Sequence, residues 1–176
     1  GAATALAALV KVNVDFMDKL DKTSSKLGIE TDFLQNMRFA AEQTGVKVEA
    51  LDMGLQRFIR RAAEAASGTG EAKRAFEQLG IQLKDSNGNL RGVELLMNDV
   101  ADGIMNTADS AEQVRLAFKF FDSEGVSLVN TLKNGSKGLK EFKTEAENLG
   151  LIISKESIKK AAMFADSLNI LKKQFT

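Results

Sequence analysis

Residues 111–138 read AEQVRLAFKFFDSEGVSLVNTLKNGSKG, and this stretch decides the fold. Its first half places five large apolar residues in one short helical pattern: Val114, Leu116, Phe118, Phe120 and Phe121. The pattern breaks at Gly125, resumes with a second apolar run and stops again at Gly135. Because polar residues form only a thin stripe in the first half, we expect that helix to be the most buried one in the chain.

The rest of the chain repeats this design of helices separated by glycines. Apolar residues recur at helical spacing, and the absence of proline leaves nothing to interrupt the helices. The predicted fold class is therefore all-α, a multi-helix bundle with long N- and C-terminal helices. The helices expected are at about residues 5–26, 31–43, 49–67, 71–79, 93–105, 124–134 and 136–149, besides the aromatic-rich helix and a last one capped by Ser154.

Two further helix signals are local. Ser110 with Gln113, or Asp109 with Glu112, offers a capping box at the start of the aromatic-rich helix. The last helix carries a series of apolar residues towards the end of the chain: Ile158, Ala161, Ala165, Leu168 and Leu171.

Four glycines mark helix ends in one recurring form, in which an apolar residue follows the glycine: Gly28, Gly45, Gly80 and Gly150. A glycine in the left-handed conformation, with an apolar residue folding back onto the last turn, is the Schellman arrangement. We interpret these glycines as helix caps and not as a phosphate-binding motif.

The spacing of apolar residues changes after Gly80. Apolar and polar residues alternate over residues 81–85, Asn87-Gly88 is a strong turn signal, and Leu90 would begin a returning strand. The pattern predicts a small β-hairpin over residues 81–91, or an exposed loop of similar shape.

The helical patterns also predict the buried core, which combines the third helix with the 111–138 stretch. Its expected members are Leu51, Leu55, Phe58, Ile59, Val114, Phe118, Phe121, Leu128 and Leu132.

The first helix carries an apolar row at alternating spacings of three and four, which we call the N-terminal seam: Leu6, Leu9, Asn13, Phe16 and Leu20. This spacing is typical of a coiled coil, through which copies of a chain self-associate. An ordinary amphipathic helix on a bundle fits the pattern equally well.

Composition excludes several classes of chemistry. The 176 residues include no His and no Cys, so there is no His base, no Cys nucleophile, no disulfide and no His/Cys zinc site. The 24 basic and 24 acidic residues give a formal net charge of +0, which argues against contact with DNA. Carboxylates such as Glu141, Glu145 and Glu147 are spread along helices, and nothing selects a catalytic pair among them. We expect no enzymatic activity, no cofactor and no metal.

Three motifs resemble binding sites only superficially. Residues 68–73 lack the spacing of a phosphate loop and suit an interhelical turn. Residues 85–89 have their glycine at the wrong position for a calcium loop. Arg57, Arg60 and Arg61 form the only concentrated basic patch, which we place on the exposed face of the third helix with Glu64 pairing Arg60.

Six blocks of sequence, in order and at sensible spacing, resemble the conserved helical region of phage tail tape measure proteins. The blocks are LGIETDFLQ (27–35), FAAEQTGV (39–46), LDMGLQRFIRRAAEAASGTGEA (51–72), FEQLGI (76–81), DSNGNLR (85–91) and RLAFKFFDSEGVSLVNTL (115–132). The chain begins Gly-Ala-Ala without Met, and we interpret it as an internal piece of such a protein from a phage or prophage.

The resemblance implies a structural role in virion assembly. Tape measure proteins occupy the lumen of the tail tube, set tail length during assembly and leave ahead of the DNA. Their location would be the bacterial host cytoplasm during assembly and then the virion tail. The implied partners are further copies of the chain, the tail tube protein and a tail assembly chaperone, with no small-molecule substrate.

We predict three segments: an N-terminal helix or coiled-coil arm (1–27), a compact tape-measure-like module (28–150) and a C-terminal helix leading into the parent protein (151–176). The alternative function is a helical adaptor or chaperone-like module that binds another protein without catalysis. Self-association through the N-terminal seam would favour the first function, and a monomer that captures a partner would favour the second.

Overall fold

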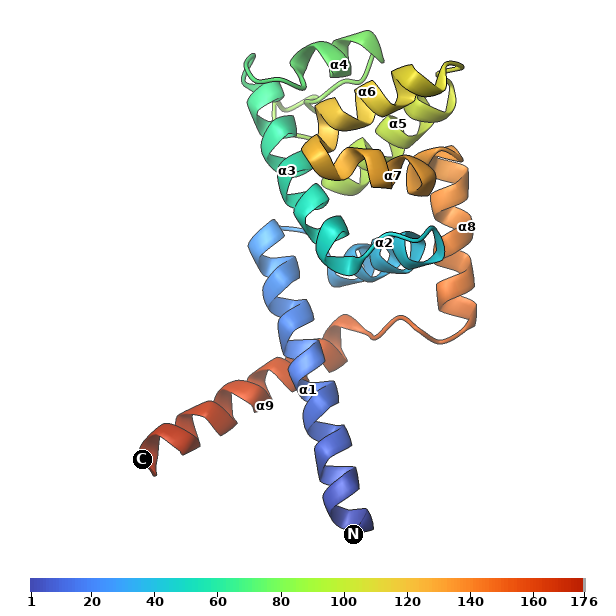
Figure 1. The fold of residues 1–176 in the computed structure, drawn as a ribbon. Helices are drawn as coiled ribbons and strands as arrows, with labels where there is room; N and C mark the ends of the chain where they lie inside the picture. Colours follow the sequence, from blue (N-terminus) through green and yellow to red (C-terminus); the bar gives the residue numbers. More distant parts are fainter. Residues whose placement is uncertain (176) are drawn as a thin grey trace. The chain divides into compact units, whose positions relative to one another are not determined.

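The structure is a computed structural model that describes residues 1–175; for residues 6–10 and 12 it describes the backbone and not the side chains. Nine α-helices and one short 3-10 helix form its regular structure, and residues 1–175 contain no β-strand. The expected all-α fold class is confirmed. Figure 1 shows the helices, which belong to two compact units.

The first unit combines residues 1–34 with the C-terminal segment from Gly150. Its long helices are α1 (Ala2–Leu27) and α9 (Lys155–Gln174), which cross and pack against each other (Figure 1). The sequence analysis treats these helices as separate terminal segments, whereas the structure pairs them in one unit. Ser154 caps α9 as expected, since its Oγ accepts a hydrogen bond from the Ser157 amide at 3.2 Å.

The second unit spans residues 35–149. In it α5 packs on α8, α6 packs on α7, and α3 contacts α4, α6 and α7. Its elements are most of α2 (Thr31–Gln43), then α3 (Val48–Ala66), α4 (Lys73–Gln78), α5 (Val93–Met105), α6 (Ser110–Phe121), the 3-10 helix η1 (Asp122–Glu124), α7 (Gly125–Leu132) and α8 (Gly135–Asn148).

Four buried phenylalanines form the centre of the second unit's core: Phe58, Phe76, Phe120 and Phe121. The rings of Phe58 and Phe121 stack with centroids 5.1 Å apart, and Phe76 meets Phe120 edge to face at 4.7 Å. Buried side chains of α3 and α7 surround this cluster, namely Leu51, Leu55, Leu128 and Leu132, while Ile59 is half-buried.

The predicted burial of Val114 and Phe118 is wrong. Both are exposed, by 38% and 42%, and the buried face of α6 consists of Leu116, Ala117, Phe120 and Phe121. Successive helical residues are about 100° apart, so closely spaced apolar residues cannot all face the core. Val114 and Phe118 lie on α6 next to its buried face and outside it. The prediction that α6 is the most buried helix is therefore wrong as well.

All four predicted capping glycines adopt the left-handed conformation, with φ between 66° and 79°. Three show the backbone hydrogen bond that defines the Schellman arrangement, for example Ile81 N to Phe76 O at 2.9 Å. The same bond occurs at Gly68, where Thr69 N donates to Glu64 O at 3.0 Å. The sequence analysis missed this cap because a polar residue follows the glycine.

Residues 81–91 form a hairpin-shaped loop and not a β-hairpin. One isolated antiparallel bridge joins Lys84 to Leu90, and the turn is closed by Asp85, whose Oδ1 accepts hydrogen bonds from the amides of Asn87 and Asn89 at 2.9 and 3.0 Å. At the start of α6 the cap is Asp109, the second of the two predicted alternatives, and it accepts from the Ala111 amide at 3.2 Å.

Candidate assembly surface

The polar motifs singled out from the sequence serve as local structure. Among the residues that the structure describes, no cluster of acidic side chains could hold a metal ion. The Asp85 carboxylate closes its own turn, as described above. At residues 68–69 both backbone amides donate to the last carbonyls of α3, so that segment is an ordinary helix end.

The predicted basic patch on α3 does not exist as a patch, because its three arginines point to different partners. Arg60 is exposed and pairs with Glu64 at 2.7 Å, as expected. Arg57 donates to Ser123 Oγ at 2.7 Å and pairs with Glu124 at 3.4 Å. Arg61 is buried. These pairings leave no concentrated positive surface on α3 for DNA phosphates.

Arg61 has a structural role that the sequence analysis missed. Its side chain is only 4% exposed, and Nη1 donates to the backbone oxygens of Phe118 and Lys119 at 2.9 and 2.7 Å. Nη2 lies 3.2 Å from Glu71 and 3.1 Å from Asp122. Arg61 thus binds carbonyls at the C-terminal end of α6, where a positive charge is favourable. The available signal was its spacing from Phe58, three residues earlier on the same face.

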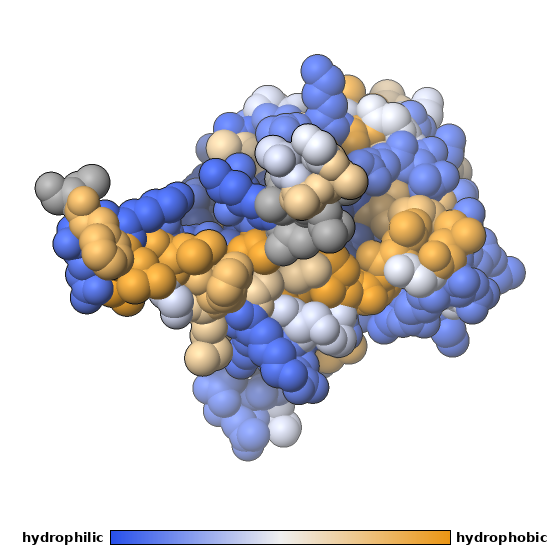
Figure 2. Space-filling model, turned by 90° about the horizontal axis from the view of Figure 1, so that it is seen from below, coloured by the Kyte–Doolittle hydropathy of each residue, from blue (hydrophilic) through white to orange (hydrophobic). Residues whose placement is uncertain are grey.

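An extensive apolar surface of the first unit lies on α9. One face of this helix is covered where it packs on α1 and consists of Ile158, Ala162 and Ala165. A second row, which we call the α9 row, consists of Phe164, Leu168, Leu171 and Phe175 and is 38–87% exposed. Its spacing of four, three and four is that of a coiled-coil seam. Figure 2 shows apolar surface along this helix, at the left of the view.

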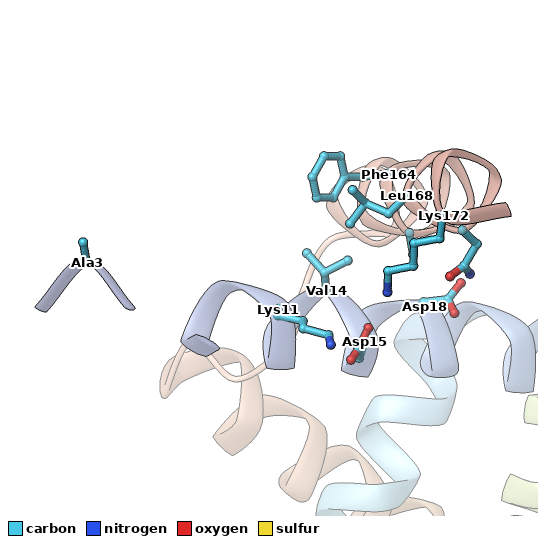
Figure 3. Close-up of a pocket in the computed structure, with 10 residues that line it drawn as sticks. Ala3, Lys11, Val14, Asp15, Asp18, Phe164, Leu168 and Lys172 are labelled. Carbon is cyan, nitrogen blue, oxygen red and sulfur yellow. The ribbon is translucent and has the colours of Figure 1, made fainter. Parts of the chain in front are cut away.

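A groove of about 650 Å³ lies beside the α9 row, between the N-terminal half of α1 and the C-terminal half of α9. Figure 3 shows Val14 of α1 and Leu168 of α9 projecting into it from opposite sides. Its charged side chains have both signs: Lys11, Asp15 and Asp18 on α1 and Lys172 on α9. The groove is therefore an apolar channel with a mixed-charge rim, which suits a helix better than a small anionic ligand.

Asp18 contributes an unused acceptor to this groove. Its Oδ2 accepts a hydrogen bond from Lys22 at 2.7 Å, which raises the pKa of the Lys22 ammonium group. Its Oδ1 is buried and accepts no hydrogen bond within residues 1–175. A buried carboxylate oxygen without a donor is costly, so Asp18 carries an unmet hydrogen-bonding requirement within the described residues.

The N-terminal seam, on α1, is only partly available as a surface. Leu20 is fully buried, Phe16 is half-exposed and Asn13 is exposed. The side chains of Leu6 and Leu9 lie outside the described residues. The structure therefore removes Leu20 from the predicted self-association surface and directs attention to α9.

An ion pair fixes the start of α9 within the same unit. Lys155 Nζ lies 2.7 Å from Glu30 Oε2, across 125 positions of sequence. The hydrogen bond lowers the pKa of the Glu30 carboxyl and raises the pKa of the Lys155 ammonium group. Because both groups are exposed, this pair positions the helix more than it stabilises it.

Within residues 1–175, none of the helices is both long and apolar enough to cross a bilayer. No protein-family model matches the sequence, and neither a curated protein nor a solved structure shows significant similarity to it.

Proposed function

We propose that this chain is a structural segment of a phage or prophage tail tape measure protein and acts in assembly without catalysis. The observation that carries the proposal is the α9 row, which has the spacing of a coiled-coil seam and is 38–87% exposed within the described residues. Such a surface suits a protein whose work is to pack against other helices. The six ordered blocks quoted above supply the family, and the all-helical fold agrees with them.

The proposed role predicts a length that the segment contributes to the tail, and this length can be measured. A single α-helix rises about 1.5 Å per residue, so the 115 residues of the second unit (35–149) would span about 170 Å if they were extended in a tube. As a compact unit of this size they would have a radius of gyration near 13 Å. The two states therefore contribute very different lengths to a ruler.

The test is an in-frame deletion of the codons for residues 35–149 in the phage or prophage that encodes the chain, with tail length measured by electron microscopy. We expect tails shortened by about 170 Å if the segment is extended in the tube, and by less if it stays folded. Silent recoding of the same codons is the control and should leave the length unchanged. Tails of normal length in the deletion strain would contradict the tape measure function.

The groove beside the α9 row favours one second candidate, a helical adaptor or chaperone-like module. Its largely apolar lining between two helices suits a single amphipathic helix of another protein. A chain that stays monomeric at high concentration and still binds tail components with unchanged tail length in the deletion strain would favour this candidate.

A further inference from the structure

We propose that the α9 row and its groove bind a second copy of this chain, so that the α1–α9 pairs of two copies form a four-helix assembly. This inference rests on the proposed assembly function and names its partner. A two-helix pair leaves much of its apolar surface in water, and pairing two such units is the usual way to cover it. From Asp166 to the end of α9 every residue is exposed, although Leu168, Ile170 and Leu171 are apolar.

The available area matches what such an interface needs. If a whole large apolar side chain is taken as about 200 Å², the exposed fractions of the α9 row amount to roughly 450 Å². A standard interface buries about 800 Å² on each partner, and a little over half of that area is apolar. The α9 row alone therefore supplies about the apolar part of one side, and the polar rim of the groove would supply the rest.

The charges at this place do not oppose the approach of a second copy. The α1 wall of the groove carries Asp15 and Asp18, and its α9 wall carries Lys172, so both signs of charge are present. The zero net charge of the chain removes long-range repulsion between copies.

The test measures molar mass by light scattering over a range of chain concentrations. We expect the wild-type chain to reach twice the mass of one 19.1 kDa chain. A variant with Leu168→Asp and Leu171→Asp should remain at the mass of one chain. Both positions are exposed, so the variant should keep its helix content, which circular dichroism checks.

The matched control carries Met163→Asp and Ile170→Asp. These side chains are 70% and 57% exposed and equally apolar, but they lie on a different face of α9 from the α9 row. This variant should still form dimers. A monomeric wild-type chain at every concentration would overturn the proposal, and so would loss of dimers in the control, which would indicate unspecific hydrophobic association.

The two proposals can fail separately. Light scattering of the isolated chain tests the partner and does not depend on tail assembly. The deletion strain tests the function and does not depend on which surface the copies share. Dimers with unchanged tail length would therefore reject the tape measure function alone, and a monomer with shortened tails would reject the α9 interface alone.

Discussion

Arg61 illustrates how a single residue can be misassigned from sequence. Three arginines at positions 57, 60 and 61 resemble a basic patch, yet the helical period places Arg61 three residues after Phe58 and four before Ala65, on the buried face of α3. A charged residue on that face needs buried acceptors, and the C-terminal carbonyls of α6 supply them. These carbonyls come from residues almost 60 positions away, so the sequence alone could not reveal them.

The variant Arg61→Ala should lose about 3 kcal/mol of unfolding free energy, because it removes a buried charge that binds two backbone oxygens and two carboxylates. The neighbouring Arg60→Ala is the control. It breaks only an exposed ion pair with Glu64 and should change stability by less than about 0.5 kcal/mol. Urea denaturation of both variants measures the difference, and equal losses would contradict the buried role of Arg61.

At the scale of elements, local sequence signals predict where helices begin and end better than they predict which face of a helix is buried. Residues 31–43 and 93–105 are the helices α2 and α5 with the expected ends. Whether a side chain is buried depends on which helices pack against its own, and the sequence does not show this. The predicted burial of Val114 and Phe118 is wrong for this reason. The same limit applies to the candidate site: the sequence shows Ile158 and Leu168 as apolar residues of the last helix, and only the structure shows that Ile158 is covered and Leu168 belongs to the exposed α9 row.

The link between α4 and α6 predicts a pH effect. Glu112 accepts hydrogen bonds from Arg115 and Gln78, at 2.6 and 2.9 Å on Oε1, and these lower the pKa of its carboxyl to about 2. Because the pKa is lower in the folded state than in the unfolded state, the link stabilises the fold above about pH 4.5. This contribution is lost as the pH falls from about 4.5 towards 2.

Carboxyl NMR during an acid titration measures this pKa directly. Removing one of the two donors with Gln78→Ala should move the pKa of Glu112 upward, towards its ordinary value of 4.5. A pKa near 4.5 in the unmodified chain would show that the link between α4 and α6 does not form in solution.

At the scale of the whole molecule, each unit has its own buried residues, so a defect in one should not spread to the other. Substitution of Gly125 would create a local defect in the second unit. A Cβ at this position would lie 2.2 Å from the Ala117 carbonyl oxygen, against backbone that cannot turn aside. The close contact of α6 with α7 thus requires a residue without a side chain.

The variant Gly125→Ala should therefore destabilise the second unit by about 2–3 kcal/mol. Hydrogen exchange should accelerate in α3, α6 and α7 and stay unchanged in α1 and α9. Gly92→Ala is the control, since nothing lies within 4 Å of its Cβ and its φ of −55° suits alanine. Faster exchange in α1 as well would show that the two units unfold together.

The attachment of α9 also has a mechanical consequence. Its contacts concentrate near its beginning, where Ser154 caps the helix, Lys155 pairs with Glu30 and Ile158 is fully buried. Beyond Ala165 every residue of the helix is exposed. A pulling force applied at the C-terminal end would therefore load these contacts one after another, starting from the exposed end of the helix. The helix would separate from α1 at low force. If the force loaded all of these contacts at the same time, a higher force would be needed to separate the two helices.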